Sequence, residues 1–484
     1  MMNNSVLAQS ISAGFPYEPT SDQSLLISKL ANFILKKDFL SVFLLKGYAG
    51  TGKTTIVSSL VRVLPQLKAK TVLLAPTGRA AKVLSVYSGQ QAFTIHKKIY
   101  RIQPTADGTM GISLQHNRHR DTFFIVDEAS MISMGNAFEQ KGPFSGRNLL
   151  DDLVAYVYNQ QNCRLILIGD NAQLPPVNSL DSPALDKLLL QERFGMEVDD
   201  FELKQVVRQS QNSGILHNAT LLREMLRQNK RGFPELALKK YADIIRLHGQ
   251  DASEEVDQAF ASRSMDQALM ICRSNKRANL YNQYIRNRVL YMEDEINAGD
   301  LLMVVKNNYF WLPNDSHAGF IANGDIVSLK RIRRYELVHG FRFAEVSVKM
   351  LDYPDEPEID CKLMLDTLHS EGPAMAGADM KRLYESVAAD TMDIRNKSAR
   401  MKAIREDPYL NALQVKFAYA LTCHKAQGGQ WEQVFVEMGY LPGQGPDREY
   451  IRWLYTALTR ATSKVYLIGF TDDFFSQKNT TYEK

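Results

Sequence analysis

The segment 47-GYAGTGKTT-55 restricts the fold of this 484-residue chain more than any other segment. It follows the apolar run 39-FLSVFLLK-46, so the pattern predicts a buried strand, a glycine-rich turn and then a helix. Gly47, Gly52, Lys53 and Thr54 fill every fixed position of the phosphate-binding loop (P-loop) pattern. The N–H groups of such a loop point at phosphate oxygens, and the helix adds its positive dipole end. The segment therefore predicts a nucleoside triphosphate site.

Each part of this site has a chemical role. Lys53 is expected to reach the β- and γ-phosphates, and the Thr54 hydroxyl is expected to bind Mg²⁺. Gln23 is a candidate for the adenine edge, because an amide both donates and accepts hydrogen bonds. The residues expected to hold ATP are Gln23, Gly47, Ala49, Gly50, Thr51, Gly52, Lys53, Thr54 and Thr55.

Two further apolar runs end in polar residues that suit the same site. The run 122-TFFIV-126 leads into Asp127, which can hold Mg²⁺ through water, and Glu128, which can deprotonate the attacking water. A second run, 164-RLILIGD-170, leads to Gln173. This glutamine is expected at the carboxyl edge of a parallel sheet, where it can sense the γ-phosphate. ATP and Mg²⁺ are therefore the expected cofactors.

The composition is that of an ordinary globular protein, with 45% apolar and 23% charged residues. The net charge of +4 is compatible with a nucleic-acid partner. The four cysteines form no CxxC pair, so neither a zinc site nor a disulfide framework is expected. The N-terminal segment has no basic signal region, and no run of about 18 apolar residues occurs. We therefore expect a cytoplasmic protein without a membrane partner.

Hydrophobic patterning divides the chain into several units. Strand–helix alternation up to about residue 195 predicts one α/β domain with a parallel sheet, interrupted at 97–121 by a basic β-hairpin. A second α/β unit begins near 201. Short strands between about 291 and 415 predict a small antiparallel barrel inserted into that unit. The charged helical segment 365–407 carries no chemistry that its residues identify.

Taken together, the motifs resemble those of superfamily 1 helicases, and within them the RecD-like and Dda-like branch (superfamily 1B). The resemblance runs from Gln23 to Gly469 in the family's motif order. The matching segments are the Q-motif glutamine Gln23, motif I 47-GYAGTGKTT-55, motif Ia 75-APTGRAA-81, motif Ib 94-TIH-96, motif II 127-DEAS-130, motif III 169-GDNAQLPPV-177, motif IV 203-LKQVVRQ-209, motif V 421-LTCHKAQGGQW-431 and motif VI 455-YTALTRA-461.

The resemblance implies two RecA-like lobes with ATP between them, a "pin" hairpin (1B) and an SH3-like barrel (2B). The expected bounds are 1–96 with 122–197 for lobe 1A, 97–121 for the pin, 198–322 with 415–484 for lobe 2A, and 323–414 for the barrel with its extra helical segment. It also implies that Arg208 and Arg460 of the second lobe reach the γ-phosphate. The residues that the resemblance assigns to single-stranded DNA are Pro76, Thr77, Arg79, Phe93, Thr94, His96, Thr422, His424, Lys425 and Gln427.

The resemblance implies a monomeric ATP-dependent DNA helicase that moves 5′→3′ on single strands and unwinds tailed duplex DNA. Two alternatives stay open at the level of sequence. One is a motor subunit of an exodeoxyribonuclease V-type complex, which would need a nuclease or repair-protein partner. The other is an ATP-driven remodeller of nucleic acid, with RNA included among its substrates, that does not separate strands.

Overall fold

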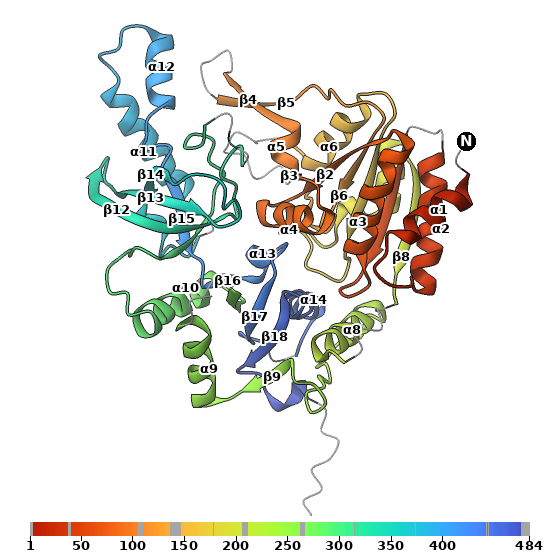
Figure 1. Cartoon of the computed structure of the whole chain (residues 1–484). Helices are drawn as coiled ribbons and strands as arrows, with labels where there is room; N and C mark the ends of the chain where they lie inside the picture. Colours follow the sequence, from red (N-terminus) through yellow and green to blue (C-terminus); the bar gives the residue numbers. More distant parts are fainter. Residues whose placement is uncertain are drawn as a thin grey trace, which may run out of the picture.

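The computed structural model (Figure 1) describes residues 3–36, 40–104, 110–135, 147–177, 179–205, 212–261, 267–313, 316, 318–372, 374–441, 443 and 445–475. It consists of two α/β lobes, a barrel beside them and a hairpin on the first lobe. This arrangement confirms the predicted fold class. Within the described ranges, no helix has the length and apolar character needed to cross a membrane.

The first lobe is built on a six-stranded sheet in which every neighbouring pair is parallel. The strand order is β3 (Ala92–Thr94), β2 (Lys70–Ala75), β6 (Thr122–Val126), β7 (Cys163–Gly169), β1 (Ser41–Gly47) and β8 (Glu197–Leu203). The helices of this lobe are α1 (Asn4–Ala13), α2 (Ser21–Leu35), α3 (Lys53–Val63), α4 (Gly78–Ser88), α5 (Ile95–Ile99), α6 (Leu149–Tyr158) and α7 (Lys187–Phe194).

Alternate residues of the central strands feed two apolar cores, one on each face of this sheet. Phe43 and Leu45 of β1 pack with α1, α2 and α3, whereas Val42 and Leu44 pack with α6 and α7. All four side chains are fully buried. Side chains of a strand alternate between faces, so a continuously apolar run is needed where helices cover both faces. The covered sheet holds the carboxyl ends of β1, β6 and β7 at one edge.

The second lobe is built on a five-stranded parallel sheet. Its order is β16 (Ala420–Thr422), β10 (Ala268–Cys272), β17 (Trp431–Glu437), β18 (Ala461–Ile468) and β9 (Ile244–Leu247). Its helices are α8 (Gly214–Arg227), α9 (Gly249–Ala261), α10 (Asn275–Tyr284), α13 (Cys423–Ala426) and α14 (Arg448–Leu458). The strand β8, expected in this lobe, instead pairs with β1, so the first sheet extends to Leu203.

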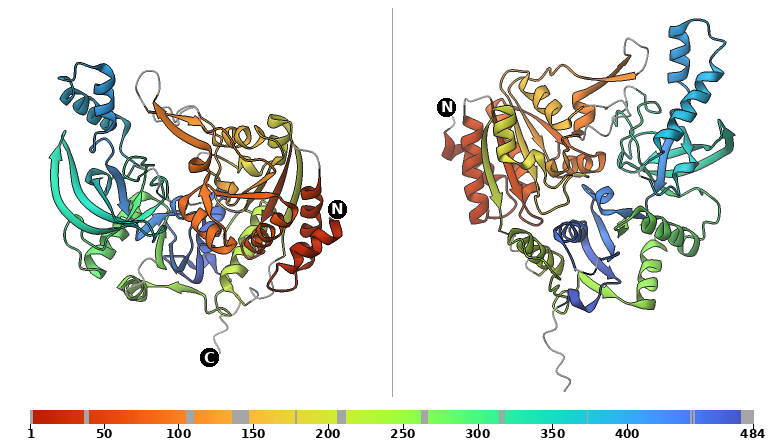
Figure 2. Two further views of the ribbon diagram at one scale, coloured as in Figure 1. Left: turned by 45° about the horizontal axis from the view of Figure 1, so that its top comes forward. Right: turned by 180° about the vertical axis from the view of Figure 1, so that it is seen from behind.

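The inserted barrel is closed and has five strands. They are β11 (Leu301–Val304), β12 (Ile326–Val338), β13 (Phe341–Met350), β14 (Ile359–Met364) and β15 (Leu413–Phe417). The barrel strands thus span 301–417, wider than the predicted 323–414, because β11 and β15 pair with each other and close it. Its core is continuous with that of the second lobe, and it lies beside the first lobe in both views of Figure 2.

Helices α11 (Gly377–Asp390) and α12 (Lys397–Arg405) form the predicted helical segment. They project from the barrel in Figure 1 and share a small apolar core with β13. Leu383, Val387 and Ile404 contribute the helical side of this core, opposite Phe341 and Phe343. The segment is therefore an extension of the barrel wall.

The predicted hairpin is confirmed as β4 (Tyr100–Pro104) paired with β5 (Met110–Leu114). The residues between the two strands, 105–109, lie outside the described residues. The basic residues expected on the hairpin are distributed differently. Lys97 and Lys98 belong to α5, and Arg101 alone of the five lies on a described hairpin strand, while Arg118 and Arg120 follow β5.

A buried ion pair joins the second lobe to the start of the barrel. The Arg286 guanidinium donates to both carboxylate oxygens of Asp300, at 2.8 and 2.9 Å. Arg286 and Asp300 are 4% and 0% exposed. The Tyr419 hydroxyl also donates to Asp300, at 3.1 Å.

We expect Arg286→Ala to lower the free energy of unfolding by about 3–5 kcal/mol, because it leaves Asp300 buried and without its cation. Chemical denaturation measures this loss. Arg288→Ala is the matched control, since Arg288 lies on the same helical turn but is exposed. Equal losses for the two variants would contradict the structural role of the pair.

Candidate functional site

The P-loop lies between β1 and α3, as predicted. Gly50 and Gly52 have φ angles of 75° and 86°, in the left-handed region that favours glycine. A Cβ atom at Gly52 would lie 2.5 Å from Gln23 Nε2, so the loop also has no space for a larger residue there. The Lys53 ammonium donates to the carbonyls of Gly47 at 2.7 Å and Tyr48 at 3.0 Å. The lysine thus folds over the loop that is expected to bind phosphate.

Gln23 lies directly beneath this loop and is fully buried. Its amide donates to Thr51 O at 3.0 Å and accepts from the Thr20 N–H at 3.0 Å. Thr20 caps α2, and it forms a capping box with Gln23. Gln23 therefore stabilises the P-loop through its contact with Thr51. Contact between Gln23 and adenine stays a prediction.

Asp127 and Glu128 follow β6 at the carboxyl edge of the sheet. Burial, and then the charge of Glu128, raise the pKa of Asp127 to about 6. Glu128 has a φ of 51°, and its N–H donates to Asp127 Oδ1 at 2.9 Å. A left-handed non-glycine residue costs roughly 1–2 kcal/mol and is frequent at functional sites. The sharp turn follows β6 directly, so it places both carboxyl groups at the carboxyl end of the strand, where a metal ligand and a base are predicted.

The turn after β7 carries Gln173, which is 5% exposed. The Asp170 carboxylate accepts the Ala172 N–H at 2.9 Å, and the Asp170 carbonyl accepts the Gln173 N–H at 3.3 Å. Among the described residues, the Gln173 amide oxygen has no hydrogen-bond partner. A buried acceptor without a partner is costly, and a bound water or ligand would satisfy it. Because this oxygen can only accept, it suits a water beside the γ-phosphate and not the phosphate oxygens themselves.

Helix α14 brings motif VI of the second lobe into contact with this edge. The Tyr455 hydroxyl accepts the Ala49 N–H of the P-loop at 3.0 Å and donates to Asp170 Oδ2 at 2.5 Å. The neighbouring Thr456 hydroxyl accepts the Leu174 N–H at 2.9 Å. The P-loop and motif III therefore meet the second lobe through a layer of buried polar contacts.

Of the two predicted arginines, the structure describes Arg460, and its contacts lie within its own lobe. Arg460 lies two residues beyond the end of α14. Its guanidinium is 4% exposed and donates to Thr456 O at 3.1 Å and Gly429 O at 3.3 Å, both in its own lobe. Arg208 lies outside the described residues. The γ-phosphate role of both stays a prediction that requires the lobes to move.

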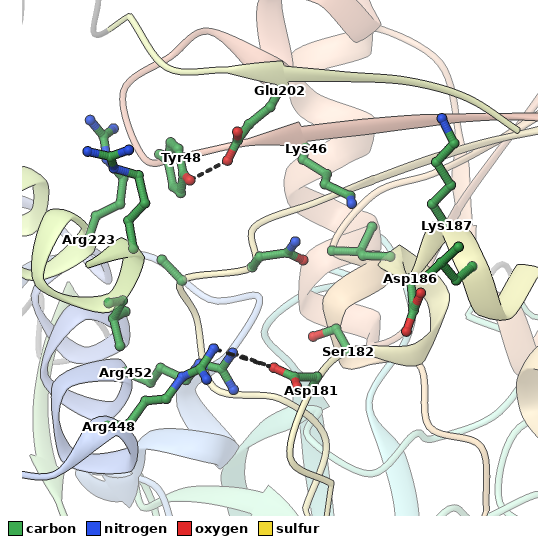
Figure 3. Close-up of a pocket in the computed structure, with 16 residues that line it drawn as sticks. Lys46, Tyr48, Asp181, Ser182, Asp186, Lys187, Glu202, Arg223, Arg448 and Arg452 are labelled. Carbon is green, nitrogen blue, oxygen red and sulfur yellow. Dashed lines mark hydrogen bonds and ion pairs between the residues drawn. The ribbon is translucent and has the colours of Figure 1, made fainter. Parts of the chain in front are cut away.

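A cavity of about 430 Å³ flanks the P-loop between the lobes (Figure 3). Lys46 and Tyr48 line it from the first lobe, and Arg223 and Arg452 from the second. The Arg223 guanidinium lies 4.2 Å from the centre of the Tyr48 ring. Arg452 donates to Asp181 at 2.7 Å, so its charge is paired. The cavity marks the junction at which the two lobes separate.

The residues present fit a Mg²⁺ ion that is bound together with phosphates. Within the described part of the chain, no group of three or more histidine, cysteine or carboxylate side chains could hold a metal alone. Mg²⁺ usually keeps several waters and takes only one or two protein ligands beside phosphate oxygens. Thr54 and Asp127 would supply these ligands, and a cation would stabilise the charged form of Asp127.

The residues expected to bind DNA on the first lobe lie at the ends of β2 and β3. Thr77 and Thr94 are the N-caps of α4 and α5. Arg79 stacks over Trp431 of the second lobe, 4.0 Å from its ring centre, and donates to Gln430 O at 3.3 Å. Arg79 therefore also joins the two lobes. DNA contact by this residue stays a prediction.

Three other residues of this set are partly covered. Pro76 lies between β2 and the Thr77 cap. The Phe93 ring has the ammonium groups of Lys97 and Lys98 over it, at 5.6 and 5.1 Å. Burial lowers the pKa of His96 to about 4, so its imidazole is neutral at physiological pH. His96 could thus bind phosphate only as a hydrogen-bond donor.

The second-lobe residues line two cavities that share His424. Thr422, His424 and Lys425 line one of about 540 Å³, and His424 and Gln427 line another of about 270 Å³. Gln427 itself is buried and donates to Leu174 O at 2.8 Å. Gln427 therefore contacts motif III in this structure.

A barrel turn at 322–325 lies between the two sets of predicted DNA contacts. Lys425 donates to Asn323 Oδ1 at 2.8 Å. Asp325 packs so closely on α4 that a Cβ atom at Gly78 would lie 2.2 Å from its Oδ1. Burial, and then the charge of Asp352, raise the pKa of Asp325 to about 8, so it is protonated at neutral pH. The barrel thus covers the track that DNA is expected to occupy.

Sequence reasoning missed the residues that join the lobes. Tyr455, Thr456 and Asp170 all stand within quoted motifs, but nothing in the residue types shows that they meet. Their signal was their place in motifs III and VI, next to residues with assigned roles.

Comparison with known proteins agrees with these features. A family model described as an AAA domain matches residues 30–252, and one described as a UvrD-like helicase C-terminal domain matches residues 417–468. The chain is 32% identical over 178 residues to the ATP-dependent RecD2 DNA helicase of Deinococcus radiodurans, covering 36% of this chain and 21% of that protein. It is 31% identical over 144 residues to the ATP-dependent DNA helicase dda of Enterobacteria phage T4, covering 29% of each.

Two other similarities extend over nearly the whole chain. Uncharacterized protein R530 of Acanthamoeba polyphaga mimivirus is 20% identical over 508 residues, covering 92% of this chain and 98% of that protein. A crystal structure of Pif1 helicase from Bacteroides with ADP-AlF3 and ssDNA superposes with a TM-score of 0.45 and 14% identity, covering 95% of each chain.

The environment of Lys425 predicts a pH-dependent interaction with DNA. Burial, and then the charge of Lys416, lower the pKa of Lys425 to about 8. The ammonium is charged below this pH and neutral above it. Raising the pH from 7 to 9 should therefore weaken binding of single-stranded DNA and reduce its salt slope by up to about 0.7, the value for one phosphate contact on a single strand.

Fluorescence anisotropy over a salt series at each pH measures this change. Lys425→Arg is the matched control, because a guanidinium keeps its charge throughout the range. An equal decrease with pH in the wild-type protein and in Lys425→Arg would contradict a contact between Lys425 and phosphate.

Proposed function

The chain belongs to the superfamily 1B helicases, and we propose that it is an ATP-dependent DNA helicase that moves 5′→3′ along single-stranded DNA and unwinds duplexes. The name of each helicase relative with about 30% identity includes ATP dependence and DNA. We further propose that it acts as a cytoplasmic monomer on tailed duplex DNA.

The contact of α14 with the P-loop and motif III is the observation that carries this proposal. It joins Ala49 and Asp170 of one lobe to Tyr455 of the other at the expected triphosphate position. A ligand that binds more tightly to one arrangement of two lobes than to another shifts the protein toward the arrangement that it prefers. Each cycle of ATP binding and release can thus move one DNA-binding surface relative to the other.

The protein residues share the work of hydrolysis in this proposal. Lys53 leaves the carbonyls of Gly47 and Tyr48 and turns to the phosphates, while Glu128 accepts a proton from the attacking water. Gln173 orients that water. Thr54 and Asp127 would hold Mg²⁺, which would neutralise phosphate charge. Arg208 and Arg460 approach as the lobes close, so transition-state stabilisation depends on closure.

DNA is proposed to cross both lobes beneath the barrel. Thr77, Arg79, Thr94, His96 and the 422–427 segment would hold its phosphates without reading bases. The contacts of the 322–325 turn with α4 and Lys425 would then open to admit the strand. The hairpin would lie at the junction between the single-stranded and the duplex DNA.

Lys53→Ala should abolish DNA-stimulated ATP hydrolysis and unwinding, because the Lys53 ammonium is the positive charge expected to bind the β- and γ-phosphates. The test compares 5′-tailed and 3′-tailed duplexes, with DNA and RNA tails in parallel. The wild-type protein should unwind only the 5′-tailed DNA substrate. Near-normal turnover by a folded Lys53→Ala protein would overturn the site, and preference for 3′ tails or RNA would overturn the polarity or substrate.

Replacing the hairpin by a short Gly-Ser turn should abolish strand separation but retain at least half of the DNA-stimulated ATPase rate. The replacement should span residues 102–113 only. Asn117 is fully buried and donates to Tyr156 O and Val157 O, so a longer deletion would disturb the lobe itself. Unwinding at the wild-type rate by this variant would show that the hairpin does not separate strands.

A further inference from the structure

The motif III turn is held on both sides of Gln173 by the second lobe. On one side, Tyr455 donates to Asp170 at 2.5 Å. On the other side, Leu174 donates its N–H to the Thr456 hydroxyl at 2.9 Å and accepts from Gln427 at 2.8 Å. The turn belongs to the first lobe, yet its position is set by three side chains of the other lobe.

Asp170 transmits this contact to Gln173. Its carboxylate accepts the Ala172 N–H at 2.9 Å, and its carbonyl accepts the Gln173 N–H at 3.3 Å. The turn is thus built on Asp170, and a shift of that carboxylate shifts the Gln173 side chain. The Gln173 oxygen has no hydrogen-bond partner among the described residues, which leaves it available for a reacting water.

The Tyr455 hydroxyl has only one way to satisfy both of its neighbours. Ala49 offers it an N–H at 3.0 Å, so the oxygen accepts there and must donate its proton to Asp170. Burial raises the pKa of the phenol well above its usual value, which keeps that proton in place. One buried hydroxyl therefore fixes the P-loop and the motif III turn relative to each other.

We propose that Tyr455 is a positioning residue for ATP hydrolysis, whose hydroxyl holds Asp170 so that Gln173 faces the triphosphate only when the second lobe is docked. Thr456 provides the second contact of the same kind. The inference rests on the proposed function and names the group through which lobe position controls hydrolysis. Gln427 connects the same turn to the segment expected to contact DNA.

Tyr455→Phe tests this, because it removes one oxygen and keeps the buried ring. We expect the DNA-stimulated kcat for ATP to fall at least tenfold, while the affinity for a fluorescent ATP analogue changes less than threefold. Tyr450→Phe is the matched control. Tyr450 lies on the same helix and is equally buried, but its hydroxyl donates to Met438 O at 3.1 Å within its own lobe.

Two further variants separate positioning from general damage. Thr456→Val, which keeps the side-chain shape, should also lower kcat without changing nucleotide affinity. Tyr455→Phe combined with Asp170→Asn should be at most twofold slower than the slower single variant. An asparagine has one acceptor oxygen and cannot accept from both the Ala172 N–H and the Tyr455 hydroxyl, so the two substitutions disturb the same set of contacts. Circular dichroism checks folding, and Thr456→Val carries the test if Tyr455→Phe is unfolded.

Several results would overturn the inference. One is a kcat for Tyr455→Phe within twofold of the wild-type value. Another is a decrease in kcat no larger than that of Tyr450→Phe. A third is a double variant with Asp170→Asn whose decrease in kcat equals the product of the two single decreases. An unchanged kcat for Thr456→Val would also overturn the inference. If the wild-type protein hydrolysed no ATP, the proposed function itself would fail, whereas active wild type with unaffected variants overturns only the role of Tyr455.

Discussion

The hydrogen bond from Tyr455 to Asp170 stabilises the arrangement on which the nucleotide site depends. Both groups are buried, so separating the lobes without admitting water would leave each unsatisfied, at a cost of about 1–3 kcal/mol per group. The neighbouring contacts of Thr456 and Gln427 are also polar. Interfaces of this kind exchange partners with water or ligand more readily than apolar ones, as relative motion of two lobes requires.

The barrel moves with the second lobe in this scheme. Its core is continuous with that lobe, and the Arg286–Asp300 pair is buried where the two meet. Its contacts with the first lobe are of another kind: Lys82 donates to Leu351 O at 3.0 Å, and Asp325 packs on Gly78. Since these contacts lie at the rim of the track, they are the ones that can open when a strand enters.

The sequence predicts local chemistry well and non-local pairing poorly. The P-loop follows from glycine conformation and spacing, and it is found as expected. The strand 197–203 was assigned to the wrong lobe because its alternating pattern does not show which sheet it joins. The barrel bounds were too narrow for the same reason, since β11 and β15 are far apart in sequence and close the barrel only by pairing. The position of Arg460 depends on where the lobes stand, which no local pattern encodes.

Two of the residues expected to bind DNA instead make hydrogen bonds between the lobes in this structure. Gln427 and Arg79 match the family's DNA-contacting positions, yet one donates to motif III and the other to Gln430 across the lobes. The Gln427 amide hydrogens that face Leu174 cannot also hold phosphate, so the proposed DNA contact would alter this inter-lobe contact. Coupling between two sites is reciprocal in free energy. A DNA strand that displaced Gln427 from Leu174 would therefore change the position of Gln173. By the same reciprocity, ATP that changed the position of Gln173 would change the affinity of the protein for the strand.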